Sequence, residues 1–599
     1  MLALRHIWQE ARDECSPRVH LAETGPGGGA RRGSGAAEPG GAAGRHGQAG
    51  RHSQGQIALD AQRRAAEQCA DLSHPAAASS QGGRALASVS TPVAASGAVG
   101  GAGSKGLKGG ALGFVSSVVI GVASTAPGYS LAVSIGVVAA VVGFQSPAIM
   151  LVAFLPMVFI AGSYYYLNRA DPDCGTTFSW ATRAMGPITG WMGGWAIIVA
   201  DVVVMASLAD VASTYTFDLF GLDKTAMAIS VGDISVSIPV LVGGILWIAV
   251  MTWICYLGIE VSARSQVLLL GAELTALAIF SALALIRVYA GDAGPAAVHP
   301  SLDWINPFLI PGPTELAAGV LVALFIYWGW DTTVSVNEES RDTNETPGRA
   351  AIVATIILVV TYLLVTIAAQ AFNGAEQLAE AGDSDILAIL GNQVMGSPLD
   401  KLLIIAVLTS AAASTQTTIL PSARTTLSMA AKGAIPSYWA RIHPRHLTPT
   451  TATVWFGVLS IAWYVTLKFL SDNVLWDATT ALGLMIAFYY GLTGVACVLF
   501  YRRHLLSSVK NFVFMGLLPI AGSLMLFWAL VKSVADNADP ANTYTGTSIF
   551  GLGLPVAVGL GLGILGVVLL LLQRRREPAF FARQREVVDP ALAGGAGGA

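Results

Sequence analysis

Charged residues are scarce in this sequence. Asp, Glu, Lys and Arg make up 12% of the 599 residues, about half of the share in a soluble domain. The 34 basic and 37 acidic residues give a formal net charge of −3, which gives no support to a nucleic-acid partner. By contrast, 54% of the residues are hydrophobic, and they gather in long uncharged runs. Such runs are typical of membrane-spanning helices rather than of a soluble core.

The motifs of metal and nucleophile chemistry are also missing. The five cysteines show no paired spacing, so the sequence predicts neither a disulfide framework nor a metal cluster. None of the nine histidines lies within a predicted span, and no zinc-protease, serine-hydrolase or phosphate-loop pattern occurs. We therefore expect no metal, no cofactor and no enzymatic activity.

The first 110 residues differ in composition from the rest. They are rich in Gly, Ala, Ser, Arg and Gln, and no apolar periodicity persists among them. Such a segment buries too little apolar surface to offset the entropy of ordering. Charges interrupt the opening "MLALRHIWQEARDEC" too early for a signal peptide. We predict a disordered low-complexity tail over 1–110 rather than a folded domain.

Beyond the tail the sequence contains twelve apolar runs, each long enough to cross a bilayer as a helix. The runs are continuously apolar rather than alternating, which excludes a closed barrel. The fold class predicted is therefore an all-α integral membrane protein with twelve transmembrane helices. Their ranges are 112–140, 147–167, 188–217, 239–258, 262–288, 316–337, 350–371, 401–430, 451–469, 475–499, 512–533 and 552–573.

Lys and Arg are distributed unequally between the two sides of this predicted bundle. Counted over the short loops and the ends of the spans, and leaving out residues 1–104, the side of the N-terminus holds nineteen of them and the opposite side holds five. Because cytoplasmic loops carry the excess of positive charge, both termini are predicted to be cytoplasmic in a multi-pass protein of the cell membrane.

The first run is interrupted by "STAPG" at its centre. Pro127 removes a backbone donor and Gly128 allows the backbone to approach a ligand closely. A broken membrane helix leaves N–H groups that suit a carboxylate at one end and carbonyls that suit an ammonium or a small cation at the other. The alternative is a plain proline kink.

The sixth run, "ALFIYWGWDTTVSVNEES", has a second interruption. Gly329 stands between two tryptophans, and Asp331 lies at membrane depth, where a charge indicates function. Paired interruptions at corresponding positions of two repeats point to a transporter binding site. The alternative for the two tryptophans is a place at the membrane interface.

Four stretches carry a family resemblance over roughly residues 111–575. They are "GVASTAPGYSLAVSIG", "WGWDTTVSVNEESRDTNETPGRAA", "ADVVVMASLA" and "PSARTTLSMAAKGAIP". They resemble segments of the amino acid–polyamine–organocation permeases, in particular a bacterial amino acid permease branch. The resemblance implies a LeuT-type fold, in which two inverted five-helix repeats (111–290 and 315–500) form a core at 111–500. Two peripheral helices at 511–575 and a cytoplasmic tail at 576–599 would follow.

The resemblance also implies a substrate site at the two interruptions. The first would hold a substrate carboxylate, carbonyls near 325–328 would take the amino group, and the aromatic side chains of the second would shape the side-chain pocket. The candidate residues are Ser124, Thr125, Ala126, Pro127, Gly128, Phe325, Ile326, Tyr327, Trp328, Gly329 and Trp330.

Ion coupling has two sets of candidates. The carboxylates Asp201, Glu273 and Asp331 are proton carriers, because the low dielectric of the membrane penalises their charged form. Some family members carry a lysine in helix 5, and this chain has none there. The hydroxyls of Ser414, Thr417 and Thr418 are sodium ligands, or else simply pack helix 8 against its neighbours.

The sequence also predicts how two further groups of charged residues are arranged. Asp201 and Asp210 are nine residues apart in one helix, which is two and a half turns, so they face opposite directions. Glu338, Glu339 and Arg341 are expected to form a structural or gating ion-pair network.

These observations predict a secondary active transporter that imports an amino acid or related amine by alternating access with proton coupling. Its partners would be a small-molecule substrate, H⁺ or Na⁺, and the lipid bilayer. The alternatives are an exchanger, a sodium-coupled symporter and a sensor with a permease fold. A channel is disfavoured because no filter motif occurs.

Overall fold

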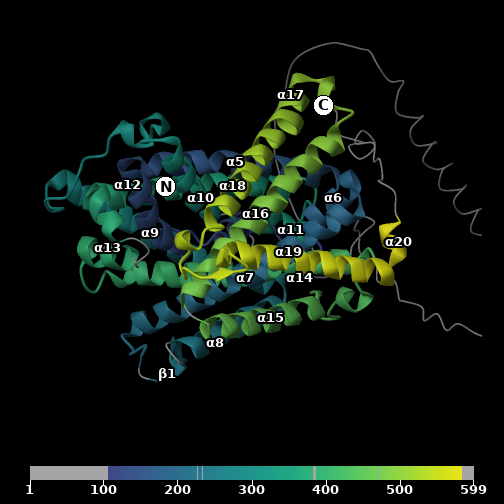
Figure 1. The fold of residues 1–599 in the computed structure, drawn as a ribbon, viewed down its shortest axis with the longest axis horizontal. Coiled ribbons are helices and arrows are strands. Elements are labelled where there is room, and N and C mark those ends of the chain that lie inside the picture. The colour runs from purple at the N-terminus through teal and green to yellow at the C-terminus, as the bar shows by residue number, and fades with distance from the viewer. Residues whose placement is uncertain (1–104, 226, 232–233, 382–385, 471, 583–599) are drawn as a thin grey trace, which may run out of the picture. The chain divides into compact units, whose positions relative to one another are not determined.

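The computed structural model describes residues 105–225, 227–231, 234–381, 386–470 and 472–582, and most of them are helical (Figure 1). Residues 1–104 of the predicted N-terminal tail and residues 583–599 of the predicted C-terminal tail therefore lie outside the described residues. Two short antiparallel hairpins, Ala228–Val231 with Ile234–Ser237 and Ser548–Ile549 with Leu552–Gly553, join helices.

The helices of the described residues have the following bounds, with the labels of Figure 1. They are α3 (Phe114–Ser124), α4 (Pro127–Val142), α5 (Ser146–Ala170), α6 (Thr177–Met185), α7 (Pro187–Phe220), α8 (Ile238–Leu257), α9 (Ile259–Ala290), α10 (Pro313–Ile326), α11 (Thr332–Ser335), α12 (Thr346–Ala381), α13 (Ile386–Met395), α14 (Lys401–Ala431), α15 (Thr450–Lys468), α16 (Asp472–Tyr501), α17 (Val509–Phe512), α18 (Leu518–Asn537), α19 (Leu554–Arg576) and α20 (Pro578–Phe581).

Ten stretches of the described residues are helices long and apolar enough to cross a membrane. A helix lies in each of the twelve predicted ranges, but the first two ranges fall within one continuous stretch, Phe114–Ala170, and the sixth holds the short α10. The all-helical membrane class is confirmed. The count of twelve spans and the inverted repeat stay predictions.

The first interruption lies at the predicted place. Helix α3 ends at Ser124, Ala126 adopts a left-handed conformation (φ 48°, ψ 63°), and α4 begins at Pro127. Proline is favoured at the first position of a helix, because its missing N–H would have no partner there and its φ is already helical.

The second interruption separates α10 from α11. Helix α10 ends at Ile326, Gly329 has φ +120°, and α11 begins at Thr332. A side chain rarely adopts such a φ, so the glycine between the two tryptophans allows this turn.

The middle of the bundle is built around α14. This helix packs against α7 and α9 and also against both halves of the first broken helix, α3 and α4. Helix α12 packs on α5 and α4, and α16 and α18 run side by side (Figure 1). Both interruptions are therefore enclosed by long helices.

The structure also describes the segment before α3 from residue 105, inside the range predicted as tail. The Leu112 amide donates to the Glu339 carbonyl oxygen (3.0 Å), and the Arg341 amide donates to the Leu112 carbonyl oxygen (2.9 Å). This parallel bridge ties the chain before α3 to the chain that follows α11. We refer to the side of the bundle that carries this bridge as the basic side, because the excess of Lys and Arg lies on the side of the N-terminal segment.

Candidate functional site

The two interruptions touch each other in the interior. The hydroxyls of Ser124 and Thr332 lie 2.8 Å apart, and Gly329 packs on the Ser124 backbone. Ser124 and Thr332 are 5% and 1% exposed, so this contact is shielded from the surface. The structure thus brings together the two segments that the sequence singled out.

The N-terminal end of α4 is capped by side chains from two other helices. The Gly128 amide donates to Glu273 Oε1 of α9 (2.7 Å), and the Tyr129 amide donates to Ser410 Oγ of α14 (3.1 Å). Pro127 has no N–H to offer. A carboxylate is favoured here, because the N-terminal end of a helix carries a partial positive charge.

The end of α3 directs its carbonyl groups toward hydroxyls. Ser414 Oγ of α14 donates to the Ser124 carbonyl oxygen (2.9 Å), and Ser130 Oγ donates to that of Thr125 (2.8 Å). The Thr125 hydroxyl itself donates to the Val122 carbonyl oxygen of α3 (2.7 Å). Among the predicted sodium ligands, Ser414 therefore reaches the first interruption.

The two other predicted sodium ligands have different surroundings. Thr417 Oγ1 donates to the Ala413 carbonyl oxygen of its own helix (3.0 Å), a bond typical of Thr inside a helix. Thr418 is buried at 2% exposure. The helix-packing interpretation suits Thr417 better than a ligand role does.

The first half of the second interruption is held by tyrosines. Tyr362 of α12 donates to the Ile326 carbonyl oxygen (2.5 Å). Tyr327 donates to the Met150 carbonyl oxygen of α5 (3.0 Å), and its ring packs edge-on against Tyr362. The Tyr327 side chain thus points toward α5.

Both tryptophans of this segment are buried rather than placed at a membrane interface. Trp328 is 7% exposed and donates through Nε1 to the Tyr489 hydroxyl of α16 (2.5 Å). Trp330 is fully buried and stacks on Tyr490, with ring centroids 5.1 Å apart. Within the part of the chain that the structure describes, Trp330 Nε1 has no hydrogen-bond partner.

Asp331 is held by three tyrosine hydroxyls. Tyr490 donates to Oδ1 (2.8 Å), and Tyr489 and Tyr164 donate to Oδ2 (3.3 and 3.4 Å). These tyrosine partners are not predicted from the sequence. The pair Tyr489–Tyr490 in one predicted span was the available signal, although nothing in the sequence shows which way the hydroxyls point.

The two aspartates of α7 face different helices, as their spacing predicts. Asp201 accepts from Ser422 Oγ of α14 (2.6 Å). Asp210 accepts from the Tyr464 hydroxyl (2.9 Å) and pairs with Lys468 Nζ (3.1 Å), both on α15. Asp201 therefore belongs to the interior, and Asp210 to an ion pair.

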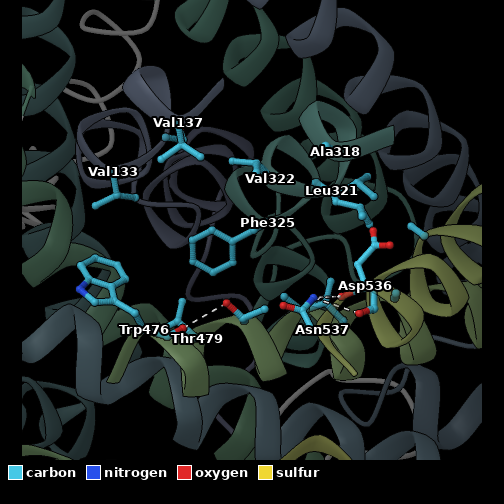
Figure 2. A pocket seen from close by; sticks show the side chains of 18 of the residues that line it. Val133, Val137, Ala318, Leu321, Val322, Phe325, Trp476, Thr479, Asp536 and Asn537 are labelled. Atoms are coloured by element: carbon cyan, nitrogen blue, oxygen red, sulfur yellow. Dashed lines mark hydrogen bonds between the residues drawn. The ribbon is translucent and has the colours of Figure 1, made fainter. Parts of the chain in front are cut away.

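A cavity of about 380 Å³ borders α10, which ends at the second interruption, and it lies on the side opposite the basic side. Its walls come from α4, α5, α10, α16, α18 and the loop after α18, and they are mostly apolar with a few polar groups. Figure 2 shows the Phe325 ring among them, with Thr479, Asp536 and Asn537 along one edge. Of the predicted substrate-binding residues, Phe325 alone lines this cavity.

Ion pairs join the elements on the basic side. Arg424 of α14 forms two hydrogen bonds with the Glu339 carboxylate (2.8 and 3.0 Å), and both side chains are almost completely buried. Lys105 Nζ pairs with Asp173 (3.1 Å) and with Glu338. This geometry agrees with the ion-pair role expected for the two glutamates.

Asp173 is the centre of this network. Lys432 Nζ lies 2.8 Å from its Oδ2, and the hydroxyls of Ser179 and Ser428 donate to its Oδ1 (2.6 Å each). Burial alone would raise the pKa of Asp173, but Lys432 and Lys105 outweigh it and hold the pKa well below its usual range. Asp173 is therefore ionised at neutral pH.

One cluster in this network has the donor atoms of a metal site. The ligand atoms of Asp173, Cys174 and Glu338 all lie within 4.8 Å of one another. The Lys105 ammonium stands among them, 3.7 Å from Cys174 Sγ, so a lysine supplies the positive charge. Burial raises the pKa of the Cys174 thiol well above its usual value, which keeps it protonated and a poor ligand.

Comparison with known proteins identifies the family. A family model described as amino acid permease matches residues 111–559. The chain belongs to the amino acid permease family. This confirms the resemblance to the amino acid–polyamine–organocation permeases.

Three relatives illustrate the range of the permease family that this chain resembles. A vacuolar cationic amino acid transporter of Arabidopsis thaliana is 25% identical over 65% of this chain and 62% of its own length. A branched-chain amino acid permease of Bacillus subtilis is 23% identical over 52% and 64%. The human Asc-type amino acid transporter 1 is 22% identical over 66% and 71%.

The matched part of this permease thus spans about three-fifths of the vacuolar transporter. The named relatives are transporters and permeases rather than enzymes. These relatives are named for different amino acids, so family membership alone does not fix the substrate of this permease.

Proposed function

We propose that this permease imports an amino acid across the cytoplasmic membrane by alternating access, coupled to protons. The observation that carries the proposal is the contact of two broken helices inside the bundle, with Glu273 at the N-terminal end of α4. Broken helices that meet at the middle of the membrane are the usual site of substrate binding in secondary transporters.

The substrate would bind at the two interruptions. The amides at the start of α4 suit its carboxylate, and Ser124, Thr125 and Ala126 line the approach. Carbonyl groups in the segment 325–328 suit its amino group. Trp328, Gly329 and Trp330 would border its side chain, and the free Nε1 of Trp330 is a donor available to it.

The route from outside would lead through the cavity above α10. Its apolar walls and few polar groups are typical of a small-molecule site. Phe325 would then separate the cavity from the interruptions. The excess of Lys and Arg on the basic side supports a cytoplasmic location for that side and for both termini.

Glu273 is the proton carrier that the contacts favour. Asp331 accepts three hydroxyl donors, which stabilise its anionic form. Glu273 accepts one amide hydrogen bond through Oε1 and has the Ser410 hydroxyl beside it, and its buried Oε2 has no partner among the described residues. An ionised Glu273 is therefore the less well stabilised of the two, whereas a protonated one leaves Oε2–H as a donor.

Uptake into proteoliposomes tests the proposal. Purified protein is assayed with labelled amino acids and amines at fixed membrane potential, with and without an inward pH gradient, and with sodium replaced by choline. We expect accumulation that follows the pH gradient and ignores the sodium replacement. Dependence on sodium with indifference to pH would contradict proton coupling and favour the hydroxyl of Ser414 as an ion ligand.

A further inference from the structure

Glu273 occupies the place that a substrate carboxylate would need. Its Oε1 lies 2.7 Å from the Gly128 amide, the first N–H of α4 because Pro127 has none. The next amide, that of Tyr129, is taken by Ser410. The end of α4 is thus closed by the protein's own carboxylate and a hydroxyl.

We propose that Glu273 competes with the carboxylate of the substrate for the N-terminal end of α4. The substrate carboxylate binds there only after Glu273 has taken up a proton, so that one proton enters with each carboxylate. This inference rests on the proposed function and adds to it how the proton and the substrate are linked.

Two carboxylates are not stable together at this point, because the described helices packed on α9 offer no unpaired positive side chain near Glu273 to separate them. Of the helices packed on α9, four contain no Asp, Glu, Lys, Arg or His, namely α3, α4, α8 and α13. The charges of α14 are Lys401 at its start and Arg424, which is paired with Glu339. The charges of α12 are Arg349 near one end and Glu376 and Glu380 near the other.

The titratable side chain of the described residues that faces Glu273 is the phenol of Tyr362 from α12, which is neutral at physiological pH. The Ser410 hydroxyl of α14 also lies beside Glu273. An incoming carboxylate would therefore meet the full charge of an ionised Glu273. Protonation removes that repulsion, and it turns the unpartnered Oε2 into a donor that can bind the arriving carboxylate.

The proton balance is simple. A proton from the side where the substrate enters binds to Oε2, and Glu273 leaves the Gly128 amide to the substrate. When the substrate departs on the other side, Glu273 loses the proton to water there and returns to the amide. No bond other than O–H forms or breaks, and one proton moves with one carboxylate.

This linkage has a consequence for the substrate. An amine without a carboxylate has nothing to place at the Gly128 amide, so it does not require the protonation of Glu273. Coupling is then expected for amino acids and not for their carboxylate-free counterparts. The suitable probes are L-arginine with agmatine and L-leucine with leucinol.

The test compares Glu273→Gln with the wild-type protein in proteoliposomes. Gln has the size of a protonated Glu, so the variant should still exchange the labelled amino acid across the membrane. The variant should no longer accumulate the labelled amino acid when a pH gradient is applied. The ratio of its concentration inside the vesicle to that outside should fall to about one. Glu260→Gln is the matched control, because it makes the same change on the same helix at a half-exposed ion pair with Lys108.

A second measurement needs no variant. Proton entry into the vesicle is recorded with a trapped pH dye while the wild-type protein takes up each probe. We expect proton entry with L-arginine or L-leucine, and none with agmatine or leucinol beyond that of protein-free vesicles.

Two results would overturn the inference while leaving the proposed function standing. One is wild-type accumulation of an amino acid by Glu273→Gln, and the other is equal proton entry with an amino acid and its carboxylate-free counterpart. Absence of any amino acid uptake by the wild-type protein would instead refute the proposed function, and the inference with it.

Discussion

Gly329 lies so close to the Ser124 backbone that a Cβ on Gly329 would stand 2.6 Å from the Ser124 carbonyl oxygen. Real Cβ atoms essentially never approach a backbone oxygen so closely, and the φ of +120° at Gly329 also disfavours any side chain. The contact between the two interruptions therefore depends on the missing side chain.

Gly329→Ala is expected to impair transport strongly. The methyl group must push the two interruptions apart or strain the backbone, which costs roughly 1–3 kcal/mol and reduces uptake about tenfold or more. Initial uptake rates in proteoliposomes measure the effect. Gly162→Ala is the control, because a Cβ there meets no heavy atom within 4 Å. Equal rates for the two variants would contradict a close-contact role for Gly329.

Tyr490→Phe is expected to destabilise the second interruption. The variant removes the shortest hydrogen bond to Asp331, and a hydrogen bond to a charged group contributes about 1.5–3 kcal/mol. The midpoint of thermal unfolding in detergent should fall, and uptake should weaken. Tyr438→Phe, at a 43% exposed position, should leave both unchanged. A Tyr490→Phe protein as stable as that control would argue against an anchoring role for Asp331.

Arg424→Met is expected to cost about 3–5 kcal/mol of stability, because it leaves the buried Glu339 carboxylate without its partner. Adding Glu339→Leu should restore most of the lost free energy of unfolding, since neither position of this pair then carries a buried charge. Arg349→Gln removes an ion pair whose arginine is 63% exposed and should cost at most about 0.5 kcal/mol. Thermal unfolding of the four proteins in one detergent is the measurement. A double variant as unstable as Arg424→Met would refute the explanation.

The Lys105–Asp173 pair is expected to stabilise the basic side at constant strength through the physiological pH range. The lowered pKa of Asp173 means that its contribution is complete above the unfolded value of about 3.9 and is lost as the pH falls below it. Burial lowers the pKa of Lys105, but Cys174, Asp173 and Glu338 together outweigh it and raise the pKa above its usual value. Its contribution is therefore complete below about pH 10.4.

Unfolding temperatures of wild-type protein and Lys105→Met should therefore differ by the same amount from pH 5 to pH 9, and by less below pH 4. Lys108→Met, at an ion pair whose two side chains are both 44% exposed, should change little at any pH. A difference that varies between pH 6 and pH 8 would mean that another group in the network titrates.

Filling the cavity is expected to slow uptake without destabilising the protein. Gly483 lines the cavity and a Cβ there meets no heavy atom within 4 Å, so Gly483→Met places its side chain in open space. Gly271→Met is the control at an equally open position that does not line the cavity. Uptake rates as fast in Gly483→Met as in the control would exclude the cavity from the substrate route.

The two interruptions could be predicted because their causes are local. Pro127 ends a hydrogen-bond ladder wherever it stands, and Gly329 permits a backbone conformation that its neighbours do not. The opposite orientations of Asp201 and Asp210 likewise follow from helical periodicity alone.

The partners of these residues could not be predicted, because they depend on how distant helices rotate against one another. Glu273 and Gly128 are 145 residues apart, and the hydroxyls around Asp331 come from α5 and α16. The same reason explains Tyr327, which faces α5 although the next residue, Trp328, faces α16. The contacts of residues 105–110 could not be predicted either, because one buried leucine and two paired lysines give no distinct pattern in a segment rich in glycine.

The bridge between Leu112 and the chain after α11 couples the half-helices α3 and α11 mechanically. Each interruption frees a half-helix on the basic side from the rest of its span, but two backbone hydrogen bonds fasten the outer ends of these halves together. Displacing α3 by itself would break both bonds at once and leave their donors and acceptors unpaired. Under the proposed import, release of the substrate on that side requires both half-helices to move together, because a displacement of either one is transmitted to the other through these bonds.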